Sequence, residues 1–418
     1  MHREPVEMTS VKIAMISLRD NPLTALHDPD AVGQRRYVAR LSAELHRLGH
    51  QLTIYTRRAD ARLPHRMRVE HGFEVVHVSA GPARKLSPDD VATHIGEFAR
   101  FLNAQWTADA PDVVHAHHWT SGLAAVLGAR RTGIPVLQSC HGLVGGESGE
   151  IERLVGRSVA GVAATSSHEA DELARLGVRR SRISVVPWGV DTRTFTPEGP
   201  ATARTGRLRL LVAGDLNPQA GVDDLITALA VVSGTELVVA GGPDRHSLAG
   251  NAEHERLRAL AARHAVTDRV GFLGHVPHSQ MPALIRSADV VVCPQRHSSS
   301  GAGSLEAMAC GVPVVAAAAG GLAEAVVHEV TGLLVPPHTP MVLARALRAL
   351  LGDELRRQEL GTAGRDRVLV RHAWDRVAPA VVRAYERVSG PEVITAQRRP
   401  PKAADEARRA LTRDERGE

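Results

Sequence analysis

The chain has 418 residues, of which 43% are hydrophobic, 23% charged and only 3% aromatic. At roughly 150 residues per domain this length predicts two or three domains, and the balance of apolar and charged residues excludes a wholly disordered or fibrous chain. The formal charge of +5 comes from scattered arginines without interleaved aromatic side chains, so the sequence does not favour nucleic-acid binding.

The apolar stretches and the spacing of the cysteines indicate where in the cell the protein is expected. The longest apolar stretch, residues 312–327, is broken by Pro313 and is mostly alanine, so no transmembrane helix is expected. The N-terminus lacks the cleavage signal of a signal peptide. Three cysteines have no paired spacing: Cys140, Cys293 and Cys310. We therefore expect a cytoplasmic protein. Its positive charge is compatible with weak peripheral contact at an acidic membrane surface. The sequence is also compatible with a homodimer.

In the first half of the chain, short β-branched runs alternate with longer helical patterns. One helix is expected over residues 38–48, where apolar residues recur every three or four positions and Gly49 supplies a stop. Strands separated by crossover helices predict a parallel sheet with right-handed connections. The expected strands are residues 11–17, 51–56, 74–78, 112–116, 135–139, 161–165 and 183–186.

The second half repeats this alternation after a stretch rich in proline and glycine. That stretch, residues 197–206, predicts a linker. We predict an α/β fold with two doubly wound, Rossmann-like domains, residues 1–196 and 207–370, facing each other across a cleft at the carboxyl ends of their strands. Residues 371–390 are predicted to form a helix that returns to the first domain, and 391–418 a charged tail. The expected strands are 208–213, 236–240, 269–273, 289–293 and 313–316.

A glycine-rich loop in the second half carries the strongest local motif. Residues 289–316 have the pattern of a strand, a Gly/Ser loop, a short helix and a strand. Such a helix presents backbone N–H groups and the positive end of its dipole, which can hold a diphosphate. Glu306, early in the helix, could accept both hydroxyls of a ribose. A plain strand-to-helix turn with an exposed glutamate fits the spacing as well. The candidate nucleotide-binding residues here are Gly301, Gly303, Ser304, Leu305 and Glu306.

The run 304–316, followed by Gly320-Gly321, Glu324 and 332–336, resembles the donor-domain signature of glycosyltransferase family 4. Ala80-Gly-Pro82 and Gly96-Glu-Phe98 are similar more narrowly to the mycothiol glycosyltransferase and sucrose-phosphate synthase branch. The resemblance implies a GT-B fold and a retaining transfer of sugar from a UDP- or GDP-type nucleotide diphosphate sugar to a small hydroxylated acceptor, with no other cofactor. Further segments similar to the family are 48–58, 111–119, 185–191, 272–276 and Trp374.

The resemblance also implies roles for individual residues. His141 matches the cleft histidine that lies near the donor sugar in the family, where it would orient or stabilise rather than attack. Gly33 matches the glycine loop of the first domain, which faces the diphosphate. Gly214 matches the end of the first strand of the donor domain.

Four positions depart from the family pattern. Asp215 stands where the family has an arginine and Ala220 where it has a lysine, and both of those cations bind the diphosphate. An anion in place of a cation about 5 Å from a phosphate costs up to ~3 kcal/mol at an effective dielectric near 20. Ser298 replaces a glutamate of the donor loop. Pro88 replaces a phosphate-binding lysine of the mycothiol-type enzymes, which argues against inositol phosphate as the acceptor.

Three arginines could replace the lost cations. Arg35 and Arg36 follow Gly33, and Arg296 lies close to the donor loop. A guanidinium can bind two phosphate oxygens at once. The alternative is that Arg35 and Arg36 open a helix and point into solvent.

Histidines cluster at two strand ends, at His115, His117 and His118 and at His141. A zinc site needs three or four convergent ligands, and neighbouring His117 and His118 are not expected to point the same way, so we expect no metal.

Two functional hypotheses follow. The sequence favours an active glycosyltransferase. The departures leave open a catalytically silent relative that acts as a nucleotide-binding or partner subunit, and another GT-B activity, such as nucleotide-sugar epimerisation, is a third alternative.

Overall fold

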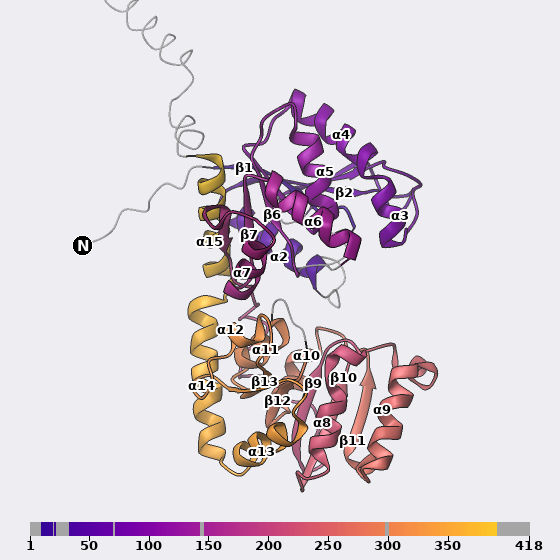
Figure 1. The fold of residues 1–418 in the computed structure, drawn as a ribbon, viewed down its shortest axis with the longest axis vertical. Coiled ribbons are helices and arrows are strands. Elements are labelled where there is room, and N and C mark those ends of the chain that lie inside the picture. Colours follow the sequence, from indigo (N-terminus) through magenta and orange to yellow (C-terminus); the bar gives the residue numbers. More distant parts are fainter. Residues whose placement is uncertain are drawn as a thin grey trace, which may run out of the picture.

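The computed structural model describes residues 10–19, 21, 33–69, 72–142, 146–296 and 301–390, with only the backbone of residues 146–148. Two α/β domains lie one above the other along the long axis of the molecule (Figure 1). The first contains an eight-stranded sheet in the order β3-β4-β2-β1-β5-β6-β7-β8, and the second a six-stranded sheet in the order β11-β10-β9-β12-β13-β14. The predicted fold class, two Rossmann-like domains, is confirmed.

The strands are short apolar runs, mostly buried on both faces as parallel strands require. In the first sheet they are β1 Lys12–Ile16, β2 Gln51–Arg57, β3 Arg66–Arg68, β4 Glu74–Val78, β5 Val113–His117, β6 Val136–Ser139, β7 Gly161–Ala164 and β8 Ile183–Val185. In the second they are β9 Leu208–Ala213, β10 Thr235–Ala240, β11 Val270–Gly274, β12 Val290–Cys293, β13 Val314–Ala317 and β14 Leu333–Val335.

Helices cover both faces of each sheet. One face of the first sheet packs against α3 Pro88–Thr93, α4 Ile95–Ala108, α5 Trp119–Ala129, α6 Gly146–Ser158 and α7 Ser167–Arg175, and the other against α2 Gln34–Arg47. One face of the second sheet packs against α8 Val222–Leu229, α9 Ala252–Arg263 and α13 Pro340–Leu351. Its other face packs against α10 Met281–Arg286, α11 Ala302–Ala309, α12 Leu322–Ala325 and α14 Glu354–Arg371.

The chain passes between the domains twice. Val186 packs in the core of the first domain, whereas Phe195 packs in that of the second. The return occurs after α14, at Ala373, and α15 (Trp374–Ser389) then packs against α2 and the first sheet. The two crossings lie side by side, since Val190 N donates to His372 O at 2.8 Å. Figure 1 shows α14 and α15 running along one side of the molecule, one on each domain.

Three details differ from the sequence expectations, and the predicted linker contacts the second domain. The strand β3 was not predicted, because its Arg-Met-Arg sequence has no apolar run to mark it. It pairs with β4 in the antiparallel direction. The three-residue strand β14 was also not predicted. The helix α2 begins four residues earlier than the apolar pattern indicates, since its first turn is polar. Residues 197–206 lie along the second domain, where Thr202 N donates to Ala283 O.

Candidate active site

A cleft of about 410 Å³ opens between the two domains, at the carboxyl ends of their parallel strands. Its walls come from α2 and the end of β6 in the first domain, and from the end of β9, the loop before α10 and the start of α11 in the second. The crossing segment and α15 close its base. The lining residues are Gly33, Gln34, Arg36, Tyr37, Arg40, His141, Trp188, Gly189, Val190, Asp191, Phe195, Ala213, Gly214, His278, Met281, Ala302, Gly303, Glu306 and Trp374.

Residues predicted from opposite halves of the chain meet in this cleft. Six of the predicted site residues line it together: Gly33, Arg36, His141, Gly214, Gly303 and Glu306. The two predicted halves of the site therefore lie on facing walls of one cleft. The remaining predicted residues lie elsewhere, and Ser298 lies outside the described residues.

Arg35 and Arg36 separate because both lie on the first turn of α2. Arg36 lines the cleft, whereas Arg35 is exposed and is not one of the described residues that line it. Successive helical residues point about 100° apart, so only one of the two can face a given wall. Both arginines open the helix, as the alternative states, but only Arg35 is exposed, whereas Arg36 lines the cleft.

Arg296 does not have the position expected of a phosphate ligand. Its guanidinium donates to both carboxylate oxygens of Asp223, at 3.0 and 2.9 Å, and to Pro218 O at 2.6 Å. This pairing neutralises its charge and fixes it against the start of α8 and the turn before it. Arg296 therefore ties the loop after β12 to α8.

Ser304 and Leu305 are also turned away from the cleft. Both are fully buried, and their N–H groups donate to Gly301 O at 3.0 and 3.2 Å. The Ser304 hydroxyl donates to the same oxygen at 2.7 Å. Gly301 permits this turn because it has a left-handed φ of 64°. The N–H groups of Ser304 and Leu305 and the Ser304 hydroxyl are therefore hydrogen-bonded within the first turn of α11. Of the nucleotide-binding residues predicted in this helix, Gly303 and Glu306 line the cleft.

Glu306 has an unusual electrostatic environment. Its side chain is 23% exposed, and burial raises its pKa to about 7, while the positive charge of Arg36 acts in the opposite direction. His278 Nε2 lies 3.7 Å from Glu306 Oε1. Glu306 therefore titrates near neutral pH, and a cation from the other domain favours its charged form.

His141 is held in a strained turn at the end of β6. Its φ of 60° is uncommon for a residue other than glycine, and the next residue is anchored by Gly142 N donating to Glu169 Oε1 at 3.2 Å. His141 Nε2 and His117 Nδ1 are 2.8 Å apart and share a hydrogen bond. Burial, and secondly His118, lower the pKa of His141 to about 3. A neutral imidazole, positioned by this pair, therefore faces the cleft.

The neighbouring histidines diverge as predicted. His117 is fully buried, whereas His118 is partly exposed and contacts Arg19 Nη1 at 3.0 Å. His115 is bonded through Nδ1 to the Tyr385 hydroxyl at 2.8 Å and through Nε2 to the Ser139 hydroxyl at 2.9 Å, which ties α15 to the first sheet. Within the described ranges, no group of three or more histidine, cysteine or acidic side chains is arranged to hold a metal ion.

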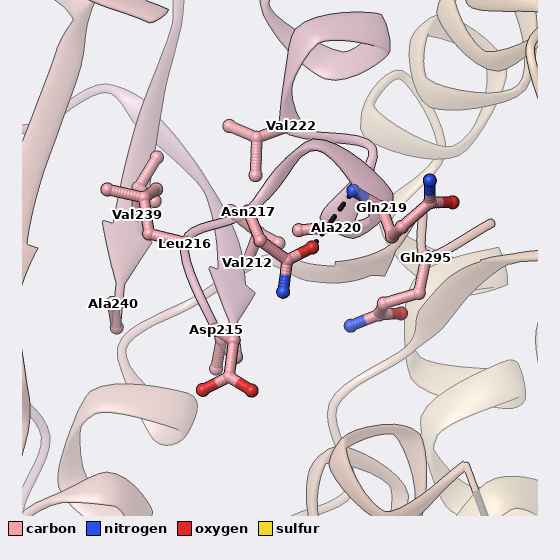
Figure 2. A pocket seen from close by; sticks show the side chains of 12 residues that line it. Val212, Asp215, Leu216, Asn217, Gln219, Ala220, Val222, Val239, Ala240 and Gln295 are labelled. Atoms are coloured by element: carbon pink, nitrogen blue, oxygen red, sulfur yellow. Dashed lines mark hydrogen bonds between the residues drawn. The ribbon is translucent and has the colours of Figure 1, made fainter. Parts of the chain in front are cut away.

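A second, smaller pocket of about 180 Å³ lies beside the cleft at the ends of β9 and β10 (Figure 2). Asp215 projects at its mouth, and Asn217 Oδ1 accepts a hydrogen bond from Gln219 N at 2.9 Å. Ala220 is buried, and Gln295 forms the opposite side. None of the described lining residues is a lysine or arginine. The place where the family has two cations is thus neutral or acidic.

Sequence reasoning missed Tyr37, Arg40 and His278, which line the cleft. Tyr37 packs against Trp188 and Trp374, with ring centroids 4.5 and 5.3 Å away, and forms an aromatic floor. Arg40 forms an ion pair with Asp191 at 2.5 Å. His278 also escaped notice, although it follows shortly after a strand, where ligand-binding residues gather. Pro88, which stands where the mycothiol-type enzymes have a phosphate-binding lysine, is the first residue of α3.

Known proteins match nearly the whole chain. A family model described as "Glycosyl transferases group 1" matches residues 199–367, and one described as "Glycosyl transferase 4-like domain" matches residues 32–189. The D-inositol 3-phosphate glycosyltransferase of Xylanimonas cellulosilytica is 37% identical over 409 residues, covering 90% of this chain and 96% of that protein. The enzyme of that name from Streptomyces avermitilis is 33% identical over 411 residues, covering 90% and 87%.

Solved structures agree with this match. Sucrose-phosphate synthase from Thermosynechococcus elongatus superimposes with a TM-score of 0.77 at 26% identity, covering 90% of this chain and 98% of that one. Anabaena HepE in complex with UDP and glucose gives a TM-score of 0.69 at 18% identity, covering 89% and 98%, which supports the fold alone. The GT-B fold expected from the resemblance is confirmed. No helix in the described ranges has the length and apolar character needed to cross a membrane.

Proposed function

Since this chain belongs to the group 1 glycosyl transferases and is a glycosyltransferase of the GT-B fold, we propose that it transfers a sugar from a nucleotide diphosphate sugar to a small hydroxylated acceptor, with retention at the sugar carbon. The observation that carries the proposal is the cleft in which Glu306 and Gly303 of one domain face Arg36 and His141 of the other. Together these residues would supply an acceptor for the ribose hydroxyls, a cation and a polar orienting group around one space.

The nucleotide would bind to the second domain. Glu306 would accept the ribose hydroxyls, which its ionised form does best because a carboxylate offers two acceptor oxygens. Because the pKa of Glu306 is about 7, nucleotide binding and ionisation of this carboxyl group would be coupled. The donor is a UDP- or GDP-type sugar, and the reaction needs no other cofactor.

The chemical step requires stabilisation of the diphosphate as it leaves and positive charge develops at the sugar carbon. Asp215 and Ala220 cannot supply this, and Arg296 is committed to Asp223. Arg36 would take over part of the role from the opposite wall. Closure of the domains would then bring the charge into place, so that catalysis depends on the closed state.

His141 would orient the donor sugar. A pKa of about 3 keeps its imidazole neutral at physiological pH, so it offers a hydrogen bond rather than a charge. Its contact with His117 restricts the ring to one orientation. The role is stabilising, with the sugar transferred from one oxygen to another without a protein nucleophile.

The acceptor is the least constrained part of the proposal. The relatives from Xylanimonas and Streptomyces are named for D-inositol 3-phosphate. Pro88 stands where the mycothiol-type enzymes have a phosphate-binding lysine, so we infer an acceptor without that phosphate group.

A catalytically silent relative is the second candidate. The acidic and neutral lining of the pocket in Figure 2 favours it, because that lining lacks the two cations of the family. Incubation with a panel of UDP- and GDP-sugars and hydroxylated acceptors, with release of free nucleotide as the readout, separates the two. Acceptor-dependent release supports the transferase, whereas binding without release under every condition supports the silent relative.

A further inference from the structure

His278 is a buried histidine on the wall of the cleft that the proposed function leaves without a role. It lies in the loop between β11 and α10, and its side chain is only 7% exposed. Its ring packs against Phe195, with centroids 5.0 Å apart. This packing fixes the direction in which the imidazole points.

The Nε2 atom of His278 is buried and has no hydrogen-bond partner. Buried polar atoms in proteins nearly always have one, so an unpartnered nitrogen beside a cleft indicates a missing ligand group. Glu306 Oε1 is the nearest acidic atom, but at 3.7 Å it is too far for a hydrogen bond. The two groups converge on the cleft without satisfying each other.

One hydroxyl group would satisfy both. A hydroxyl donates one hydrogen bond and accepts others, whereas a carboxylate only accepts and an Nε2–H only donates. An oxygen within hydrogen-bond distance of both atoms would therefore donate to Glu306 and accept from His278. Arg36 faces Glu306 from the opposite domain, and its charge favours the ionised, accepting form of the carboxylate against the effect of burial.

We propose that His278 and Glu306 together form a subsite that recognises a ribose hydroxyl of the nucleotide, with His278 as the residue that discriminates ribose from deoxyribose. This inference rests on the proposed function and names a contact within it. A site that hydrogen-bonds a hydroxyl rejects the analogue without it, because the buried polar groups are then left unpaired.

The test is a set of affinities for UDP, GDP and their 2′-deoxy and 3′-deoxy analogues, measured by calorimetry on the full chain. The wild type is expected to prefer the ribonucleotide at least tenfold over one of the deoxy forms. In His278→Phe, which keeps a ring against Phe195, this preference falls at least fivefold through weaker ribonucleotide binding, while affinity for that deoxy form stays within twofold. His278→Gln retains an amide donor and part of the preference, and exposed His246→Phe is the control.

Equal weakening of both nucleotides in His278→Phe would show a merely structural role and overturn the proposal, as would an unchanged ratio. If His278→Phe does not fold, His278→Leu and His278→Gln give the same comparison. Failure of wild-type protein to bind either diphosphate would instead remove the proposed function and this inference with it.

Discussion

Arg36 of the first domain and Glu306 of the second lie on opposite walls of one cleft, and the charge of the arginine lowers a carboxylate pKa that burial raises. The two residues are 270 positions apart in the sequence. Their relationship couples the charge state of the proposed ribose site to the distance between the domains. Any motion that separates the walls weakens the electrostatic effect of Arg36 on Glu306.

The first prediction uses the separation of Arg35 and Arg36 on α2. Arg36→Ala should weaken binding of nucleotide diphosphates by about 1.5–3 kcal/mol, the range for a lost charge-assisted hydrogen bond. Arg35→Ala is the matched control, because it removes the same charge from an exposed neighbour. Calorimetry at low and moderate salt should show both a lower affinity and a smaller salt dependence for Arg36→Ala alone. Equal affinities of the two variants would rule out Arg36 as the compensating cation.

The second prediction concerns Glu306 and pH. Its folded pKa of about 7 lies above its ordinary value of 4.5, so the folded state retains a proton that the unfolded state loses. Between pH 4.5 and about 7, unfolding therefore releases a proton from Glu306, and the free energy of unfolding falls as the pH rises through this range. Glu306→Gln removes this loss and should stabilise the empty protein at pH 8 by on the order of 1–3 kcal/mol, with no difference near pH 4.5.

The same substitution should weaken nucleotide binding, so stability and affinity move in opposite directions. Urea unfolding at pH 4.5, 6 and 8 measures the first and calorimetry the second. Glu386→Gln, at an exposed position of α15, should change neither. A Gln variant that is less stable than the wild type at pH 8 would contradict the raised pKa.

Most strands, and the segments that meet in the cleft, could be predicted because each carries a local signal. β12 is an apolar run, β5 begins with two valines, and Gly301 marks the turn into α11. The failures concern long-range contacts. Arg296 precedes the donor loop in the sequence, which suggested a contact with phosphate. In the fold its guanidinium instead pairs with Asp223, 73 residues away, and this pairing cannot be read from a local motif. His278 carries no local motif for a cleft residue.

The third prediction restores the family cations in the pocket of Figure 2. Asp215→Arg with Ala220→Lys should raise the affinity for nucleotide diphosphates by about ten- to hundredfold, since replacing an anion by a cation near a phosphate is worth up to ~3 kcal/mol. Asp215→Asn should give a smaller gain through loss of repulsion alone. Affinity for the uncharged nucleoside should stay constant. Unchanged diphosphate affinity in the double variant would place the diphosphate away from this pocket.

The last prediction concerns the buried histidines beneath the cleft. Burial lowers the pKa of His115 to about 3, so the folded state keeps it neutral while the unfolded state takes up a proton below 6.5. Its contribution to stability is therefore fully present above pH 6.5 and is lost as the pH falls toward 3. Each such histidine adds a slope of about 1.4 kcal/mol per pH unit in this range. His117 and His141 act in the same direction.

His115→Gln tests this contribution, because its amide can still bond to the Tyr385 and Ser139 hydroxyls that hold the imidazole. We expect the variant to be less stable than the wild type at pH 7.5 but to lose stability less steeply between pH 6.5 and 4.5. The change in slope should be no more than about 1.4 kcal/mol per pH unit. Urea midpoints across this range provide the measurement, with exposed His246→Gln as the control. Parallel pH profiles for wild type and His115→Gln would mean that His115 is protonated in the folded protein, and that the bond between α15 and the first sheet is formed by a charged imidazole.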